Sequence, residues 1–580
     1  MAFGAAGTYI LVPRFGWAVS AWGSALGALF GASWILVIDP QIDVRLDIAT
    51  VTVLSGALVG TFIGLRKGNT AAPLAAPPLL ATSAVLLPAL ITGVLFYGAS
   101  VVRGMPLGWA MQGDAQFNTV LSRQIGASNG AALDDGQVLS LAQGLMAMVH
   151  QPGRSAIPVD DLLLHDIARQ ANLWMLFILL SSVLAGTIAE RVLRDASIGV
   201  RLFGIVASGL LPLAWHITGY ALNAGFYNVS LTLLTLELTF YFWLAFPRQP
   251  LWRSSILLAL GVVMLGAWTP MAVIPAVLAS WSAWEGLRTN PDRRALVVWA
   301  IMAAQFAAFV VTFVLPGFLE KSDVLSVSGS IIPLDRHIYV AVSVAAILMS
   351  VFLGNAHSAA PDGVDSARAK RHFATGVALV ALAAAAGTAF LVFQNRHLPD
   401  FWTYYPIKFA WIAMEMLVLL LFLGTVIFMT GLRARRLAMI AAGVSVSLLL
   451  LSVLQLNPPQ QGGTTSAFPI LALAKNDSPA DATLPLLTTV SGERVFFYRY
   501  STLEQDTFMN QWQFQITAED EFTPIREFAY TAVSSVTDAC DAARAWGGDV
   551  TVVTSRPIVA RGLDARCPDL LTAVVRPSLE

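Results

Sequence analysis

Runs of roughly 20 apolar residues recur from residue 17 to residue 455, and short polar segments separate them. A helix that crosses lipid needs such a run, because its backbone groups find no water to bind and must be satisfied internally. The composition agrees, since 56% of the 580 residues are hydrophobic and only 12% are charged, against about a quarter charged in soluble domains. The chain is therefore predicted to be a polytopic α-helical membrane protein with about 13 transmembrane helices. The spans are expected near residues 17–38, 48–65, 79–98, 171–190, 202–221, 226–246, 254–268, 270–285, 295–317, 338–356, 374–393, 407–431 and 437–455.

The segments on either side of Thr269-Pro270 are short and could form either a tight helical pair or one long kinked helix. The basic residues decide between these alternatives. If the segment were a single helix, every later loop would lie on the other side of the membrane. Three strongly basic loops would then be outside, against the rule that basic loops are cytoplasmic. We therefore predict the pair.

Lys and Arg collect in cytoplasmic loops, and this rule orients the chain. With the N-terminus inside, 17 basic residues fall in cytoplasmic segments and nine on the opposite side up to the last span. The start from Met1 to Val12 is apolar but precedes Arg14 without an Ala-x-Ala site, so no cleavable signal peptide is expected. The prediction is a multi-pass plasma-membrane protein with its N-terminus inside and its C-terminus outside.

The expected domains are a transmembrane domain over residues 1–455, a linker over 456–465 and an extracytoplasmic α/β domain over 466–580. A long loop, 99–170, and a shorter one, 318–337, share the outer side with this domain. The inner loops are short, so any chemistry is expected on the outer side.

The tail has an α/β pattern. Strands are predicted over 494–500, 512–516, 550–554 and 571–575, and a helix over 534–546 that ends at Gly547-Gly548. The two cysteines of the chain, Cys540 and Cys567, both lie here. Disulfides persist outside the cell, which favours a bridge between them over two buried thiols.

Asp114 is the first candidate for chemistry, in the sequence Gly113-Asp114-Ala-Gln-Phe-Asn118 of the long outer loop. A carboxylate just outside the membrane could take a proton from a sugar hydroxyl or bind a divalent cation such as Mg²⁺, Mn²⁺ or Ca²⁺. The alternative is an ordinary N-cap for a helix over residues 115–125.

Asp161 and His165, in the same loop, are four residues apart and would share a helix face, so they are candidate metal ligands together with Asp114. Solvated side chains are the alternative. Val138, Leu141, Leu145 and Met148 repeat at helical spacing and predict a helix lying in the membrane interface.

Lys408 is the second candidate, in Tyr404-Tyr405-Pro-Ile-Lys408 at the outer end of a span. It would meet a phosphate at headgroup depth, although an aromatic belt with a snorkelling lysine is the alternative. The outer ends of other spans carry further candidate substrate-binding residues, which are Arg336, His337, Arg396 and His397.

Three ionisable residues fall inside expected spans: His216, Glu237 and Glu415. Such groups are costly in lipid and usually face a cavity or a partner. His216 is expected to share an outward-rising helix face with Tyr220 and Asn223, and it is counted among the candidate substrate-binding residues.

This layout resembles the GT-C superfamily of membrane glycosyltransferases, particularly the large actinobacterial members that build cell-envelope polysaccharide. The resemblance rests on Asp114 in a large outer loop, many spans with short inner loops, the Tyr404–Lys408 segment and an outer C-terminal domain. Asp114 follows the third expected span, whereas the acidic loop of the family follows the first. The resemblance implies a polyprenyl-phosphate-linked sugar donor, a glycan or lipid acceptor, Asp114 as the base and Lys408 as the phosphate ligand.

The charge balance and the apolar runs also limit the partners. A net charge of -1 provides no basic field for nucleic acid, so membrane lipids and lipid-linked substrates are the expected partners. A transporter or flippase, and a polymerase of a polysaccharide precursor, remain the alternatives. No convincing internal duplication of the kind found in transporters is apparent in the sequence.

Overall fold

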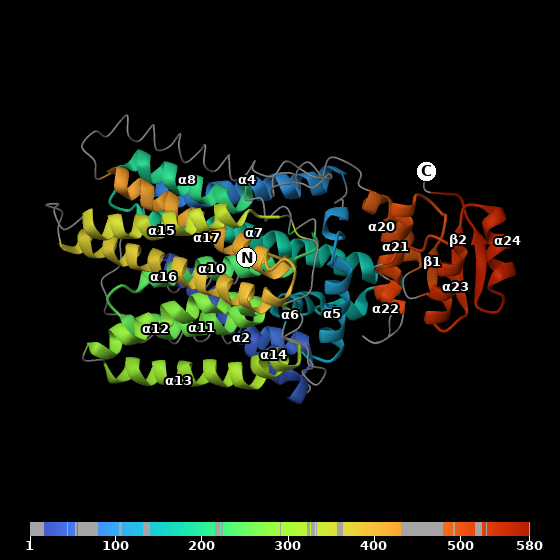
Figure 1. The fold of residues 1–580 in the computed structure, drawn as a ribbon, viewed down its shortest axis with the longest axis horizontal. Coiled ribbons are helices and arrows are strands. Elements are labelled where there is room, and N and C mark those ends of the chain that lie inside the picture. The colour runs from blue at the N-terminus through green and yellow to red at the C-terminus, as the bar shows by residue number, and fades with distance from the viewer. Residues whose placement is uncertain are drawn as a thin grey trace.

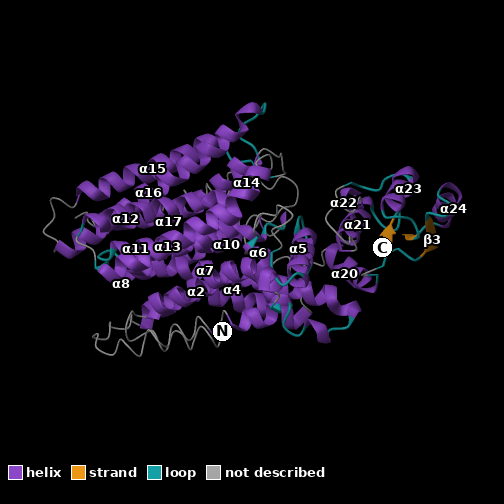
Figure 2. Cartoon of the chain, turned by 90° about the horizontal axis from the view of Figure 1, so that it is seen from below, coloured by secondary structure: helices purple, strands orange, loops and turns teal. Residues whose placement is uncertain are grey.

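The computed structural model describes residues 17–42, 44–52, 55, 79–103, 107–131, 140–214, 221, 224–289, 292–321, 325, 331, 333–356, 364–430, 479–490, 493–516, 525–528 and 531–578. Long helices lie side by side along the long axis of the molecule, and a small domain that contains the strands lies at one end (Figures 1 and 2). The long helices are α2 (Trp17–Ile42), α4 (Leu79–Arg103), α7 (Leu162–Val192), α8 (Ile198–Ala214), α10 (Tyr227–Ala245), α11 (Pro250–Trp268), α12 (Val273–Arg288), α13 (Arg293–Phe309), α15 (Arg336–Ala356), α16 (Val364–Gln394) and α17 (Tyr404–Thr430).

Eight helical stretches among the described residues are long and apolar enough to cross a membrane. The surface of the bundle supports the same conclusion. On α4, the side chains of Leu86, Leu87, Leu90 and Ile91 are between 43% and 62% exposed. Water would penalise such an apolar face, whereas lipid tails accommodate it. The predicted multi-pass membrane protein is therefore confirmed at this level.

Each of the long helices coincides with an expected span. The expected span at 48–65 lies mostly outside the described residues, and the one at 437–455 lies entirely outside them.

The helices α11 and α12 form the predicted pair. A short 3₁₀ helix, η4 (Thr269–Ala272), joins them. The hydroxyl of Ser254 donates to the carbonyl of Ala279 (2.8 Å) and the guanidinium of Arg253 donates to Ser282 (2.7 Å). Arg253 therefore pairs with the later residue 282 and Ser254 with the earlier residue 279, so the two helices run antiparallel.

The helix α13 continues through a π-helical turn, η5 (Val310–Val314), into α14 (Leu315–Lys321). At the end of the bundle that faces the small domain lie η1 (Gly108–Ala110), α5 (Ala115–Ala127), α6 (Leu141–His150), η2 (Arg154–Ala156) and η3 (Val159–Asp161), and η7 (Asn395–His397) precedes α17.

The helix α6 was expected to lie in the membrane interface, and this prediction is wrong. Leu141, Met146, Ala147 and Met148 are all at most 5% exposed. Both faces of α6 are covered because it packs against α5 and α7 and approaches α2, α10 and α11. Its apolar spacing reflects burial in protein rather than contact with lipid headgroups.

The small domain is a parallel three-stranded sheet in the order β1-β2-β3, made of β1 (Val495–Phe497), β2 (Val550–Thr554) and β3 (Leu571–Val575). Its helices are α20 (Pro479–Thr489), α21 (Leu503–Ile516), α22 (Ile525–Phe528), α23 (Val536–Ala545) and α24 (Pro557–Arg566). These elements confirm the predicted α/β tail, whereas the expected linker over 456–465 lies outside the described residues.

The prediction of a strand over 512–516 is wrong, because these residues form the last turns of α21. Two faces of this helix are buried against different partners. Trp512 is fully buried and its indole nitrogen donates to the carbonyl of Met111, 3.2 Å away, in the bundle. The ring of Phe514 packs against Phe496 and Trp546 inside the small domain. Because two sides of this helix are buried, apolar residues occur at every second position, Trp512, Phe514 and Ile516, which is also the pattern of a strand.

The helix α23 and its disulfide match the predictions. Ser535 and Asp538 form a reciprocal capping box at its start, and Gly547 and Gly548 follow it with φ of +90° and +76°, the left-handed conformation that ends helices. Cys540 in α23 and Cys567 just after α24 are joined in the predicted disulfide, with a Cα–Cα distance of 5.7 Å.

Candidate functional site

Asp114 occupies the N-cap position of α5 but does not cap the helix through its side chain. The backbone makes the local contacts instead, since the amide of Asp114 donates to the carbonyl of Ala224 (3.0 Å) and the amide of Asn118 donates to the carbonyl of Asp114 (3.0 Å). Asp114 thus stands at the N-cap position, as the alternative predicted, but its carboxylate makes no capping hydrogen bond. The carboxylate remains available for another role.

Two glycines fix the loop that carries Asp114. Gly113 has φ of +57° and Gly225 has φ of +72°, a region that side chains disfavour. A Cβ on Gly225 would stand 2.5 Å from the amide nitrogen of Asp114, and a Cβ on Gly113 would meet the carbonyl of Ala224. Asn118 completes the joint by donating to the carbonyl of Gly225 (2.8 Å). The loop therefore presses directly on the segment that leads into α10.

Lys408 lies in the second turn of α17 and is only 5% exposed. Its ammonium nitrogen is 4.2 Å from the ring centre of Phe226, 5.4 Å from that of Tyr404 and 5.5 Å from that of Trp268. It also donates to the side-chain oxygen of Asn228 and to the hydroxyl of Tyr404, each at 3.4 Å. We call Phe226, Asn228, Trp268 and Tyr404 the Lys408 cage. These side chains come from three helices or their ends and hold the cation through ring faces and neutral oxygens.

Asp114 and Lys408, 294 positions apart in the sequence, are brought into electrostatic range of each other. Burial raises the pKa of Asp114, and the positive charge of Lys408 opposes that rise. The two are not in direct contact, because no ion pair among the described residues joins them. A base and a cation held near each other without neutralising one another can act on two atoms of one substrate.

Tyr404 and Tyr405 extend this arrangement. Their rings meet edge to face with centres 5.0 Å apart, and Tyr405 lies within the electrostatic range of Asp114. Both tyrosines are partly buried. The Tyr404–Lys408 segment and the Asp114 loop, which were predicted separately, therefore meet in the fold.

The other predicted basic residues lie apart from the cage. Arg336, His337, Arg396 and His397 are exposed at the ends of α15 and α16. The guanidinium of Arg336 lies 5.6 Å from the ring centre of Phe401 and that of Arg396 lies 3.7 Å from that of Phe393. None of the four has a described contact with Lys408. His216, Tyr220 and Asn223 lie outside the described residues.

The predicted metal ligands do not assemble. Asp161 is exposed and His165 contacts Asp166 (3.3 Å), which also binds Arg123 and Arg154. Among the described residues, no group of three or more His, Cys, Asp or Glu side chains is placed to hold a metal. The spacing of Asp161 and His165 predicted a shared helix face. The imidazole of His165 instead contacts the carboxylate of Asp166, so it does not join Asp161 in a metal site.

No family model, curated protein or solved structure matches this chain.

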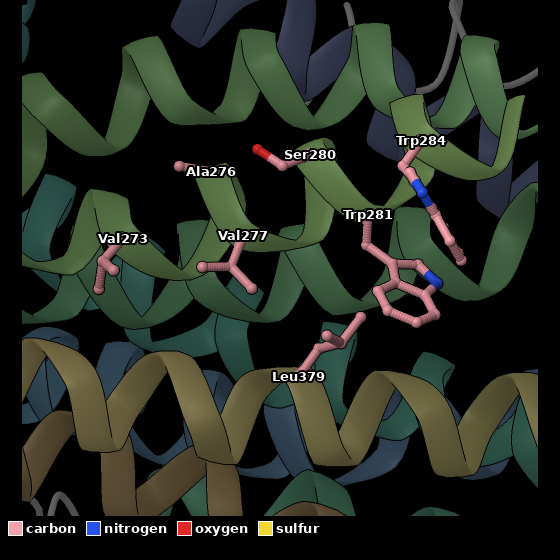
Figure 3. A pocket seen from close by; sticks show the side chains of 7 residues that line it. All are labelled: Val273, Ala276, Val277, Ser280, Trp281, Trp284 and Leu379. Atoms are coloured by element: carbon pink, nitrogen blue, oxygen red, sulfur yellow. The ribbon is translucent and has the colours of Figure 1, made fainter. Parts of the chain in front are cut away.

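A groove of about 490 Å³ runs along α12 beside α16. Figure 3 shows its lining side chains, which are Val273, Ala276, Val277, Ser280, Trp281 and Trp284 of α12 and Leu379 of α16. All but Ser280 have apolar or aromatic side chains. The groove is open rather than enclosed, and Trp281 and Trp284 are 39% and 46% exposed. It spans about 16 Å along the helix, at a rise of about 1.5 Å per residue from 273 to 284.

One end of this groove lies next to the Lys408 cage. Trp268 of the cage directly precedes η4, and Val273 of the groove directly follows it. Gly387 of α16 makes the packing close, because a Cβ there would stand 3.1 Å from the side chain of Val273 and would clash with the ring of Phe409, the neighbour of Lys408 in the sequence. The groove and the cage are thus linked through η4 and through the packing of α16 against Val273 and Phe409.

Sequence reasoning missed three residues of the cage: Phe226, Asn228 and Trp268. Two of them stand beside a visible turn signal. Phe226 follows Gly225, and Trp268 precedes Thr269-Pro270. The sequence cannot show that these turns surround one lysine, because the pairing of distant helix ends is a tertiary property.

The buried carboxylates of Glu237 and Glu415 form a second polar feature. Glu237 is 3% exposed and accepts a hydrogen bond from Ser181 (2.6 Å). Glu415 is 2% exposed, and neither of its side-chain oxygens has a hydrogen-bond partner among the described residues. The two side chains interact electrostatically with each other. No described contact joins them to Asp114 or Lys408.

Proposed function

We propose that this protein transfers a sugar from a polyprenyl-phosphate-linked donor to a glycan or lipid acceptor of the cell envelope, on the extracytoplasmic side of the membrane. The observation that carries the proposal is the approach of Asp114 to a buried lysine that has no carboxylate partner among the described ion pairs. The resemblance of the layout to GT-C glycosyltransferases supports the same reaction.

The chemistry assigns one role to each side chain. An acceptor hydroxyl gives its proton to the Asp114 carboxylate as its oxygen attacks the anomeric carbon of the donor sugar. The bond from that carbon to the phosphate oxygen breaks, and the electron pair leaves with the polyprenyl phosphate. The Lys408 ammonium stabilises the negative charge that grows on the leaving phosphate.

The groove along α12 supports a lipid-linked donor. It is apolar and starts beside the Lys408 cage. We infer that an isoprenoid chain lying there brings its phosphate toward the lysine.

The proposed topology has thirteen spans in the plasma membrane, with the N-terminus inside and the C-terminal domain outside. The excess of basic residues in the inner loops supports it. The Asp114 loop and the small domain lie at the same end of the bundle (Figure 1), which is consistent with one outer face.

The decisive experiment uses purified protein in lipid nanodiscs supplied with radiolabelled polyprenyl-phosphate sugars and envelope glycan acceptors. The wild type should transfer sugar, and Asp114→Asn should reduce transfer at least 100-fold while the variant stays folded. Asp161→Asn is the matched control, since this exposed carboxylate lies near the start of α7, outside the site, and its loss should leave the rate unchanged. Full activity in Asp114→Asn, or inert wild-type protein across the common donors, would overturn the proposal.

Lys408 has its own test in the same assay. Lys408→Gln removes the charge and should lower kcat at saturating donor, because the leaving phosphate loses its stabilising cation. Lys408→Arg keeps the charge and should retain more activity than Lys408→Gln. Equal rates in the two variants would show that the charge of residue 408 does not act in the reaction.

A transporter is the second candidate, because Glu237 and Glu415 are buried carboxylates of the kind that carry protons through bundles. It predicts ion-driven uptake or lipid flipping that Glu415→Gln abolishes and Asp114→Asn leaves intact. The glycosyltransferase proposal predicts the opposite sensitivity in the transfer assay.

A further inference from the structure

The carboxyl ends of the three strands in the small domain carry a set of arginines. Arg499 follows β1, Arg556 follows β2 and Arg576 follows β3. All three side chains are exposed. In parallel α/β sheets, this edge is where ligands bind.

The strand register places these residues at one level. Val553 pairs with Phe497 and Thr554 pairs with Val575. Beyond the last pairs, the amide of Ser555 donates to the carbonyl of Arg499 (3.4 Å) and the amide of Arg576 donates to the carbonyl of Thr554 (2.9 Å). The three loops are therefore tied together, at a strand spacing of about 4.8 Å.

Contacts of the side chains agree with this convergence. Arg576, which follows β3, reaches into electrostatic range of Tyr500, which follows β1. The guanidinium of Arg499 lies 5.4 Å from the ring centre of Tyr498. The hydroxyl of Ser555 donates to the carbonyl of Arg499 (3.0 Å), which again ties the loop after β2 to the loop after β1.

The nearby acidic side chains are Glu504, exposed in the first turn of α21, and Asp506, two residues further on. None of the ion pairs in the described part of the chain includes Arg499, Arg556 or Arg576. Asp506, which lies at the same edge, is buried, and its carboxylate accepts hydrogen bonds from the amides of Tyr500 and Ser501 (3.0 Å each). The described part of the small domain has ten acidic and eight basic residues, so the positive edge contrasts with the rest.

The helix α24 adds to the positive potential. It begins at Pro557, directly after Arg556, and no side chain caps its first turn. Pro557 has no N–H, and the amides of Val559 and Ala560 donate to the carbonyl of Arg556. The amide of Ile558 and the positive end of the helix dipole are therefore what this turn offers to an anion.

We infer that the carboxyl edge of this sheet, formed by Arg499, Arg556 and Arg576, is a binding site for a phosphate group. Three guanidinium groups provide more fork-shaped donors than the two oxygens of a carboxylate can use, whereas the oxygens of a phosphate can accept from several of them. The phosphate belongs either to a soluble phosphorylated compound or to a lipid headgroup. The site is separate from Asp114 and Lys408 and does not depend on the proposed transfer.

The test is calorimetric titration of the full chain, in neutral phosphatidylcholine nanodiscs at low salt, with inorganic phosphate. We expect saturable binding that weakens at least tenfold when Arg499, Arg556 and Arg576 are all changed to Gln. Arg494→Gln is the matched control, because Arg494 precedes β1 at the opposite edge and should leave the affinity unchanged. Because the three changed residues are exposed, the variant should keep its fold, which the intact Cys540–Cys567 disulfide and the melting temperature will report.

Two further arms separate the possible sources and the two proposals. If a lipid headgroup fills the site, phosphatidylglycerol in the nanodisc should weaken the apparent affinity for phosphate in the wild type but not in the triple variant; if a soluble compound does, it should change neither. Asp114→Asn should bind phosphate as the wild type does, whatever happens to sugar transfer. Unchanged binding in the triple variant, an equal loss in Arg494→Gln, or no saturable binding to the wild type would overturn the inference.

Discussion

Lys408 is a buried cation surrounded by rings and neutral oxygens rather than by carboxylates. Cation–π contacts and two long hydrogen bonds stabilise an ammonium group without cancelling its charge. An anionic ligand can therefore still gain from it. A direct salt bridge between Asp114 and Lys408 would have neutralised both charges, so neither group could act on a substrate.

The charge of Lys408 also predicts a pH effect on Asp114. Burial raises the pKa of Asp114 and Lys408 lowers it. As a base, Asp114 must be ionised, so transfer should fall as the pH drops through this pKa. Lys408→Gln removes the lowering effect and should move the acidic limb of its remaining activity to higher pH. A limb that stays in place, or moves to lower pH, in pH–rate profiles would contradict this coupling.

Gly225 offers a second prediction at the residue scale. Gly225→Ala places a Cβ 2.5 Å from the Asp114 amide and holds the residue in an unfavourable conformation, which alone costs about 1–2 kcal/mol. We expect a lower melting temperature and, because a displacement of about 1 Å can cost 100-fold, a transfer rate lower by roughly that factor.

Gly153 is the matched control, because it also has positive φ (+79°) but a Cβ there meets nothing within 4 Å. Gly153→Ala should lower the melting temperature by a similar backbone cost and leave transfer nearly intact. Equal losses of transfer in the two variants would show that backbone strain, not the position of Asp114, governs the rate.

At the residue scale, the sequence allowed Asp114, Lys408 and the two tyrosines to be selected, because Asp114 lies in the long outer loop and Lys408 stands beside aromatic residues at the outer end of a span. It did not allow the surroundings of His165 to be predicted, because His165, Arg123 and Arg154 all contact the carboxylate of Asp166, and Arg123 comes from a distant part of the sequence.

At the scale of elements, α21 connects the small domain to the candidate site. Trp512 donates to Met111, which lies three residues before Asp114, and α21 packs against α5. The apolar core is continuous across this junction, because Met509 and Trp512 belong to the same buried cluster as Trp109 and Met111. The small domain therefore helps to hold the Asp114 loop.

Trp512→Phe tests this role while keeping a ring in place. The variant leaves the Met111 carbonyl without its donor, which costs about 1–3 kcal/mol when a group is buried. We expect a roughly tenfold lower transfer rate and faster proteolysis at the junction. Trp546→Phe is the control, since Trp546 packs against Phe514 within the small domain and should affect stability but not transfer. Equal effects of the two changes on transfer would remove the special role of Trp512.

Elements were predicted well where one environment surrounds them. Apolar runs in lipid and strands such as β2 give clean patterns. The predictions failed at α6 and at residues 512–516, because these helices are buried by protein on more than one side. The pair α11–α12 was recovered from charge, since only a hairpin leaves the basic loops on one face.

At the scale of the whole molecule, orientation and redox state are linked. The only cysteines of the chain form the Cys540–Cys567 bridge, and disulfides persist outside the cytoplasm. The bridge closes a loop of 27 residues, and such a loop corresponds to about 3–4 kcal/mol of stabilisation by chain entropy.

The wild type thus has no free thiol, so single introduced cysteines can report topology. Ile558→Cys on α24, where the side chain is 72% exposed, should react with a membrane-impermeant maleimide in intact cells. Thr289→Cys, between α12 and α13, should react only after the cells are lysed. The reverse pattern would invert the proposed orientation, and labelling of both positions in intact cells would contradict the proposed placement of the hairpin.

Under the proposed function, the open groove along α12 has a kinetic consequence, because the helices that line it, α12 and α16, belong to stretches long and apolar enough to cross a membrane. A donor that enters it arrives by lateral diffusion within one leaflet. The quantity that saturates the proposed transferase is then the mole fraction of donor among the lipids. Diluting the same donor with inert lipid should slow turnover even when its bulk concentration is constant.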